Sequence, residues 1–259
     1  MLVTGGTMLD QRRWLLGALA LLLLLALWSA LTYGGLVTRA VLPTPGDVLR
    51  AVPALHFDDS LVRSAFWSFW RITFAFVLTV LVAVPLGILA GICPPFKAFA
   101  WPVAEPLRYL PIAAVVPLTI YWFGIEEAQK IALLFIGTVV YFYPLVVEAV
   151  ERVDRAYLET AATLGATRLQ ALRHVLVPIA LPAIFEAGRV VYGIGWTYVI
   201  LAEVINAEYG LGYIAQISAK RGQLDRIFAV VIVILLLGFL TDAFLALLSK
   251  LLFRWRREA

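Results

Sequence analysis

Six apolar runs dominate the sequence, and they constrain the fold more than any other feature. They cover residues 14–31, 72–96, 100–123, 131–147, 181–204 and 227–248. A helix needs roughly 20 apolar residues to cross the hydrocarbon core of a bilayer. Because lipid offers no partner for backbone N–H and C=O groups, each run is expected to be helical.

The composition supports a membrane protein. Hydrophobic residues make up 63% of the chain and charged residues only 15%, whereas soluble domains carry about 25% charge. We therefore expect an all-α, polytopic membrane protein of about six transmembrane helices. A single cysteine, Cys93, excludes an internal disulfide and a cysteine-based zinc cluster. The basic residues flank the apolar runs and act as topology signals rather than as contacts to nucleic acid.

The runs also suggest how the chain is organised. The first run is longer than the roughly 7–15 apolar residues of a signal peptide, which favours a retained anchor over a cleaved segment. With both termini in the cytoplasm, the inner segments hold more Lys and Arg than the outer ones. We expect residues 1–33 to form a cytoplasmic segment and the first span, and 34–65 a periplasmic connection in which Asp47 opens a short helix. Residues 66–250 would form a core of five spans with a cytoplasmic loop at 148–180, and 251–259 a basic cytoplasmic tail.

The loop at 148–180 is neither continuously apolar nor rich in turns. One face of its first helix has little bulk and consists of Leu158, Ala161, Ala162 and Gly165. Gly165 is a suitable helix stop, and Thr167 with Gln170 fits a capping box that opens a second helix. Pro178 is expected to end that helix. The residues alone predict a helical hairpin, and they leave open whether it is an interfacial element or a docking surface.

Charged residues inside the apolar runs are candidates for the path of a solute. Glu105 with Arg108, and Glu186 with Arg189, are three residues apart and can pair on one helix face. Since an intramembrane charge is costly, each pair either binds two spans together or faces a wet path for an anion.

Other polar and irregular positions carry weaker signals. Glu203 and Asn206 lie at the outer end of the fifth run, where they would form part of a gate, and Asp242 is expected to pair or reach towards the inner face. Four prolines make the run at 100–123 irregular, as in a span that lines a cavity or in a kinked packing helix. Gly87 and Gly91 form a Gly-x-x-x-Gly pattern that permits close helix contact.

The loop also resembles a known motif. Glu159-Thr160-Ala161, Gly165, Val175 and Val177-Pro178 are spaced as in the EAA loop of ABC-importer permeases, whose pattern is Glu-Ala-Ala, three residues, Gly, nine residues, Ile-x-Leu-Pro. Thr160, Val175 and Val177 depart from that pattern by small chemical changes. Shorter pieces are similar to the nitrate, sulfonate and taurine branch of these permeases, and the resemblance extends over about residues 40–250. These pieces are residues 42–45, 107–111, 120–125 and 210–213.

The resemblance implies a type I ABC-importer permease in the bacterial inner membrane. Its partners would be cytoplasmic ATPase subunits, a periplasmic or lipid-anchored substrate-binding protein and a second permease chain, expected to be a copy of this one. The loop residues that would contact the ATPase are Leu158, Glu159, Thr160, Ala161, Ala162, Gly165, Val175, Val177 and Pro178.

The resemblance also bears on cofactors and substrate. No Gly-x-x-x-x-Gly-Lys-Ser/Thr phosphate loop is present, so ATP and Mg would be bound by the partner and the chain itself would be no enzyme. The substrate would be a small anion such as nitrate, bicarbonate, taurine or another sulfonate, although the branch also handles some heterocyclic vitamin precursors. The alternative is a secondary transporter driven by an ion gradient, with its coupling site among the buried charges.

Overall fold

The computed structural model describes residues 6–205 and 207–257, and the regular structure within these ranges is helical. Five of the helices are long and apolar enough to cross a membrane, or six if one bent pair counts as a single span. The expected all-α, polytopic architecture is therefore confirmed. The chain divides into two compact units, Met1–Ser60 with Ala215–Ile232, and Leu61–Ile214 with Val233–Ala259.

The first unit holds α1 (Gly6–Tyr33), α2 (Pro45–Asp59), much of α10 (Leu211–Lys220) and the start of α11 (Leu224–Leu252). The indole N–H of Trp28 donates to the Pro43 carbonyl at 2.9 Å. Helix α2 begins with a capping box in which Thr44 is the N-cap and Asp47 the third helical residue. The expectation that Asp47 itself opens the helix was wrong, because the Thr44 side chain and Asp47 satisfy each other's backbone amides.

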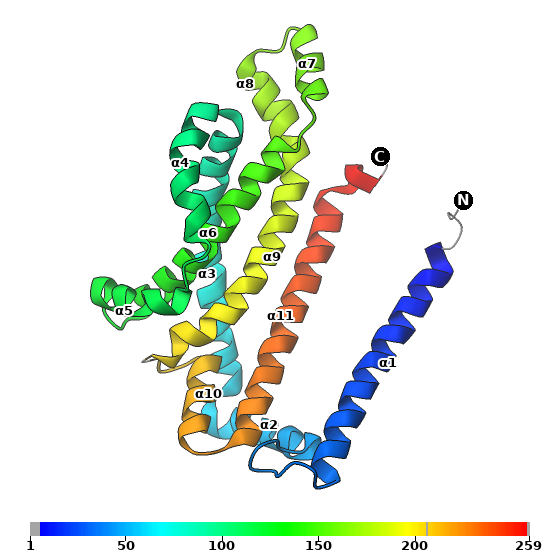
Figure 1. The fold of residues 1–259 in the computed structure, drawn as a ribbon, viewed down its shortest axis with the longest axis vertical. Coiled ribbons are helices and arrows are strands. Elements are labelled where there is room, and N and C mark those ends of the chain that lie inside the picture. Colours follow the sequence, from blue (N-terminus) through cyan, green and yellow to red (C-terminus); the bar gives the residue numbers. More distant parts are fainter. Residues whose placement is uncertain (1–5, 206, 258–259) are drawn as a thin grey trace. The chain divides into compact units, whose positions relative to one another are not determined.

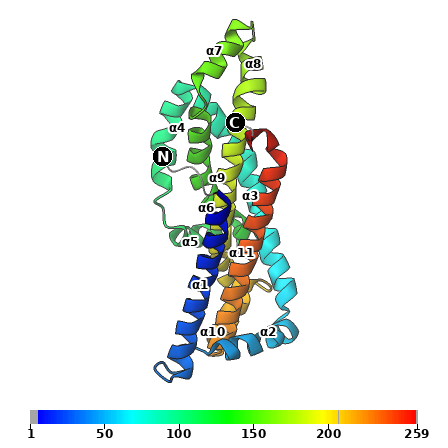
Figure 2. The same cartoon turned by 90° about the vertical axis from the view of Figure 1, so that its right-hand side faces the viewer.

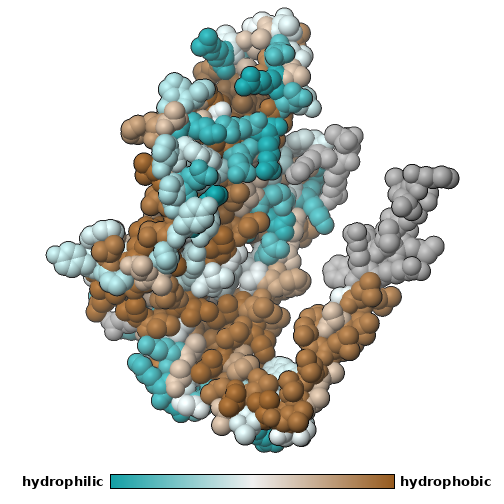
Figure 3. Space-filling model, viewed as in Figure 1, coloured by the Kyte–Doolittle hydropathy of each residue, from teal (hydrophilic) through white to brown (hydrophobic). Residues whose placement is uncertain are grey.

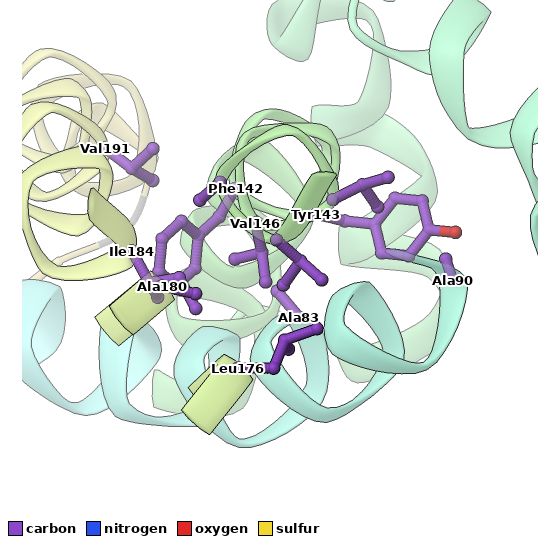
Figure 4. Close-up of a cluster of buried hydrophobic side chains, with 12 residues drawn as sticks. Ala83, Ala90, Phe142, Tyr143, Val146, Leu176, Ala180, Ile184 and Val191 are labelled. Carbon is purple, nitrogen blue, oxygen red and sulfur yellow. The ribbon is translucent and has the colours of Figure 1, made fainter. Parts of the chain in front are cut away.

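The second unit is built around α3 (Leu61–Ile92), α6 (Glu127–Glu151) and α9 (Val177–Val204), and α6 packs along both of the others (Figure 1). Figure 4 shows Phe142, Tyr143 and Val146 of α6 with side chains of α3 and α9 around them. Gly87 and Gly91 of α3 face Val146 and Val150 of α6, where an added Cβ would collide with the valines. The Gly-x-x-x-Gly pattern therefore marks a real close contact between two helices.

The third apolar run is divided into two helices. It forms α4 (Pro94–Leu107) and α5 (Ile112–Phe123), which are bent by 104° relative to each other. Pro111 is the N-cap of α5, and a residue that precedes a proline is driven out of the helical region. The prolines predicted an irregular span, and the structure shows that the irregularity is a sharp turn.

Candidate functional site

A helical hairpin extends from one end of α6 and α9, as Figures 1 and 2 both show. It consists of α7 (Arg155–Thr163), α8 (Arg168–Ala171) and the π-helical turn η1 (Leu172–Leu176), which runs directly into α9. We refer to these three elements as the hairpin. The space-filling view shows hydrophilic residues over it, whereas hydrophobic residues cover much of the middle of the second unit (Figure 3).

Two sequence signals set the turn of the hairpin. Gly165 has φ = +80°, and its N–H donates to the Ala162 carbonyl at 3.0 Å while the Ala166 N–H donates to the Ala161 carbonyl at 3.0 Å. This is a Schellman motif, which favours glycine because a side chain is strained at positive φ. Thr167 and Gln170 then form the capping box of α8. Both signals were predicted from the sequence and both are confirmed.

Pro178 does not end the second helix, contrary to expectation. The Val177 N–H donates to the Leu172 carbonyl, five residues back, and the helix then continues to Val204. Pro178 follows this π-helical turn directly, inside a helix that runs without a break from Arg168 to Val204. In the π-helical turn before Pro178, backbone hydrogen bonds join residues five apart instead of four, and this wider turn accommodates the proline within the helix.

The small-residue face of α7 is only partly turned towards the protein itself. Ala161 is 8% exposed and Leu158 is half-buried, so these two residues pack within the hairpin, and contact of this face with an ATPase stays a prediction. Because Ala161 is small, α7 lies close to η1. A groove of about 560 Å³ runs along the hairpin and is also lined by Ile92, at the end of α3. The outward side of α7 carries exposed residues, including Tyr157, Glu159, Thr160 and, at the tip, Leu164. Ala162 and Gly165 are also exposed, and Val175, Val177 and Pro178 are half-buried at the base.

A buried polar network lies at the other end of the second unit. We call its four residues, Ser68, Arg71, Glu127 and Glu203, the polar hub. The Arg71 guanidinium donates to both carboxylate oxygens of Glu127 at 2.7 Å and to Glu203 at 2.8 Å. Arg71 is 2% exposed and Glu203 is 0% exposed, so both charges depend on each other for compensation.

The polar hub also fixes the turn that follows α9. Arg71 donates to the Tyr209 carbonyl at 2.7 Å, and Glu203 accepts from the Gly212 N–H at 2.9 Å. Ser68 donates to Glu203 and accepts from the Leu211 N–H. The sequence pointed to Glu203 but missed Arg71, whose signal was a charge within an apolar, aromatic-rich stretch. Asn206, the other expected gate residue, lies outside the described residues.

The two predicted i,i+3 pairs are both formed, but they differ in strength. Arg189 donates to Glu186 at 2.6 Å and to both oxygens of Asp242 at 3.0 and 3.1 Å, so α9 is tied to α11. Asp242 was expected either to pair or to reach towards the inner face, and the structure shows that it pairs with Arg189. Two carboxylates around one guanidinium give this cluster a net negative charge.

Arg108 is bound far less firmly. Its contact with Glu105 is a single one at 3.4 Å, and a second N–H···O contact of 3.1 Å reaches the Tyr109 hydroxyl. Among the described residues, the buried Arg108 Nε has no hydrogen-bond partner, although the side chain as a whole is 39% exposed. The Tyr141 hydroxyl donates to the Arg108 carbonyl at 3.0 Å and so holds this backbone against α6.

An all-helical chain with several long apolar helices, ion pairs within them and a polar hairpin belongs to the class of polytopic membrane proteins. Residues 83–254 match the family described as binding-protein-dependent transport system inner membrane component. The chain is 32% identical over 251 residues to the taurine transport system permease protein TauC of Escherichia coli (strain K12), with 94% of this chain and 90% of TauC covered. It is 26% identical over 246 residues to the nitrate import permease protein NrtB of a Synechocystis strain, with 90% and 87% covered.

Solved structures agree on the fold. An inward-facing structure of the MetNI methionine ABC transporter superposes with a TM-score of 0.66 at 20% identity, over 73% of this chain and 94% of that one. The chain belongs to the family of binding-protein-dependent transport system inner membrane components, the permease subunits of ABC importers.

Proposed function

We propose that this chain forms the translocation path for a small anion in an ATP-driven importer, and that the hairpin couples it to a separate cytoplasmic ATPase. Its relatives TauC and NrtB are named for taurine and nitrate transport. Taurine, nitrate, another sulfonate or bicarbonate is accordingly the proposed substrate. ATP and Mg are bound by the ATPase, and a substrate-binding protein delivers the anion at the outer face.

The arrangement in the membrane is part of the same proposal. Two copies of the chain enclose the path in the inner membrane, and both termini lie in the cytoplasm. A reporter active only outside the cytoplasm should stay silent when fused after Ala259 and should be active when fused after Pro53. The reverse pattern would contradict this orientation and would place the hairpin on the wrong side for an ATPase.

The hairpin is the observation that carries the coupling proposal. Its turn is fixed by two consecutive capping motifs, so it presents a defined surface rather than a flexible loop. Leu164 at the tip is 84% exposed, and Tyr157 on the outward side of α7 is 55% exposed. Exposed apolar side chains on an otherwise polar element favour contact with a partner protein.

The test is co-purification of the ATPase with tagged permease at matched expression. Leu164→Asp should lose the ATPase because it places a charge in the apolar contact, while its exposure leaves folding unaffected. Gly165→Val should also lose it, because valine is strained at φ = +80° and redirects α8. Leu36→Asp is the matched control, since Leu36 is 76% exposed in the first unit, away from the hairpin in sequence.

The control variant should keep the ATPase at the wild-type level. Retention of the ATPase and of transport by both hairpin variants would show that the hairpin is not the coupling surface. Ala161→Trp is a poorer test, because Ala161 is buried within the hairpin and its replacement changes the hairpin itself.

A further inference from the structure

Arg108 lies deep in the membrane region. It directly follows α4, at the bend before α5, and its carbonyl is held by the Tyr141 hydroxyl of α6. At about 1.5 Å per residue, Tyr141 is about 21 Å from the start of α6 and about 15 Å from its end. The hydrocarbon core of a bilayer is about 30 Å thick, so Arg108 lies near its middle.

The pairing of Arg108 is weak in comparison with the other arginines at depth. Arg71 makes four hydrogen bonds, to two carboxylates and a carbonyl. Arg189 is held by two carboxylates at 2.6 to 3.2 Å. Arg108 has one carboxylate contact at 3.4 Å and a buried Nε without a partner. Its positive charge is therefore the least compensated of the three.

A second observation at the same position points to water rather than lipid. The backbone between Leu107 and Ile112 is not helical. Irregular backbone at membrane depth is tolerated where protein covers it or where it lines a water-filled cavity. Tyr109 is 74% exposed there and lies beside the Arg108 guanidinium.

From these observations we infer that Arg108 is the residue within the membrane that receives the oxyanion of the transported substrate. Its planar guanidinium offers parallel N–H donors that match a sulfonate or nitrate. Arg189 is unsuited to this role because Glu186 and Asp242 already occupy its donors. This inference rests on the proposed import of small anions and names the residue that selects them.

The test uses proteoliposomes that contain the permease, its ATPase and its binding protein, with taurine and nitrate as probes. Arg108→Gln should lower uptake at least tenfold, and Arg108→Lys should lower it less because the charge remains. ATP hydrolysis stimulated by the binding protein should persist in both. Arg50→Gln is the matched control, since this arginine is 84% exposed and weakly paired in the first unit, and its uptake should stay within twofold.

Uptake by Arg108→Gln within twofold of the wild type would overturn the inference and leave anion import standing. If the wild-type chain takes up neither probe, nor bicarbonate or another sulfonate, anion import itself would be overturned.

A second measurement is independent of how well Arg108→Gln assembles. Tyr109→Cys in a Cys93→Ala background leaves the neighbouring Arg108 in place. This cysteine should react with a water-soluble maleimide, and taurine or nitrate should slow that reaction at least threefold. An unreactive cysteine, or one that reacts at the same rate with and without the anions, would contradict a substrate-contacting position.

Discussion

Removal of the Arg71 side chain should destabilise the protein more than any surface change of the same kind. In Arg71→Met, Glu203 remains 0% exposed and keeps only the Ser68 hydroxyl and the Gly212 N–H as donors. Removal of one partner from a buried ion pair lowers the free energy of unfolding by about 3–5 kcal/mol. For a chain of this size, each kcal/mol of lost stability lowers the melting temperature by roughly 2–4 °C, so the melting temperature should fall by about 6–20 °C.

The measurement is thermal unfolding in lipid nanodiscs, followed by tryptophan fluorescence. The double variant Arg71→Met with Glu203→Gln should melt well above the single variant, because no uncompensated charge is left inside. Glu127 is 46% exposed and can return to water, so it needs no change. Arg50→Met serves as the control, because its pair with Asp47 is 3.7 Å long and exposed and contributes no more than about 1 kcal/mol. A single variant that melts within 2 °C of the wild type would refute the reasoning about the polar hub.

Three further predictions concern packing, capping and nucleotide. Gly87→Ala should lower the free energy of unfolding by about 1–3 kcal/mol, because the added Cβ would lie 2.6 Å from Val146. Gly193→Ala is the control: its Cβ would meet nothing within 4 Å among the described residues, so this variant should melt at the wild-type temperature or above. The hydrogen bond from Thr44 lowers the pKa of Asp47, so the cap of α2 is fully present above the ordinary aspartate value of about 3.9 and is lost as the pH falls through the lowered pKa. Amide exchange at the start of α2, corrected for its intrinsic pH dependence, should rise over that range in the wild type and show no such step in Asp47→Asn. Purified permease alone should hydrolyse no ATP, and added ATPase should restore hydrolysis; robust turnover by the pure chain would contradict the division of labour.

The parts of the fold that local signals determine could be predicted from the sequence. Length and apolarity predicted the spans, since the bilayer requires both. The hairpin was predictable because Gly165 and the pair Thr167 and Gln170 act within a few residues of each other. The i,i+3 pairs were predictable for the same reason.

Features that depend on distant partners could not be read from the sequence. The second apolar run was given as 72–96, yet α3 begins at Leu61 and holds Arg71 within it. This buried charge is compensated by Glu127 and Glu203, from two other helices. The orientation of α7 depends on packing against η1, so the inward position of Ala161 was equally hidden. Pro178 was misjudged because a π-helical turn, which has no sequence signature of its own, precedes it.

The source of energy for transport tests the central claim most directly. Uptake of taurine or nitrate should be measured in proteoliposomes that hold the permease, its ATPase and its binding protein, with ionophores present to collapse proton and sodium gradients. An ATP-driven importer should still accumulate the anion when ATP is supplied on the side of the hairpin, and should stop when ATP is omitted. Accumulation that needs an ion gradient and proceeds without ATP would contradict the account and identify a secondary transporter.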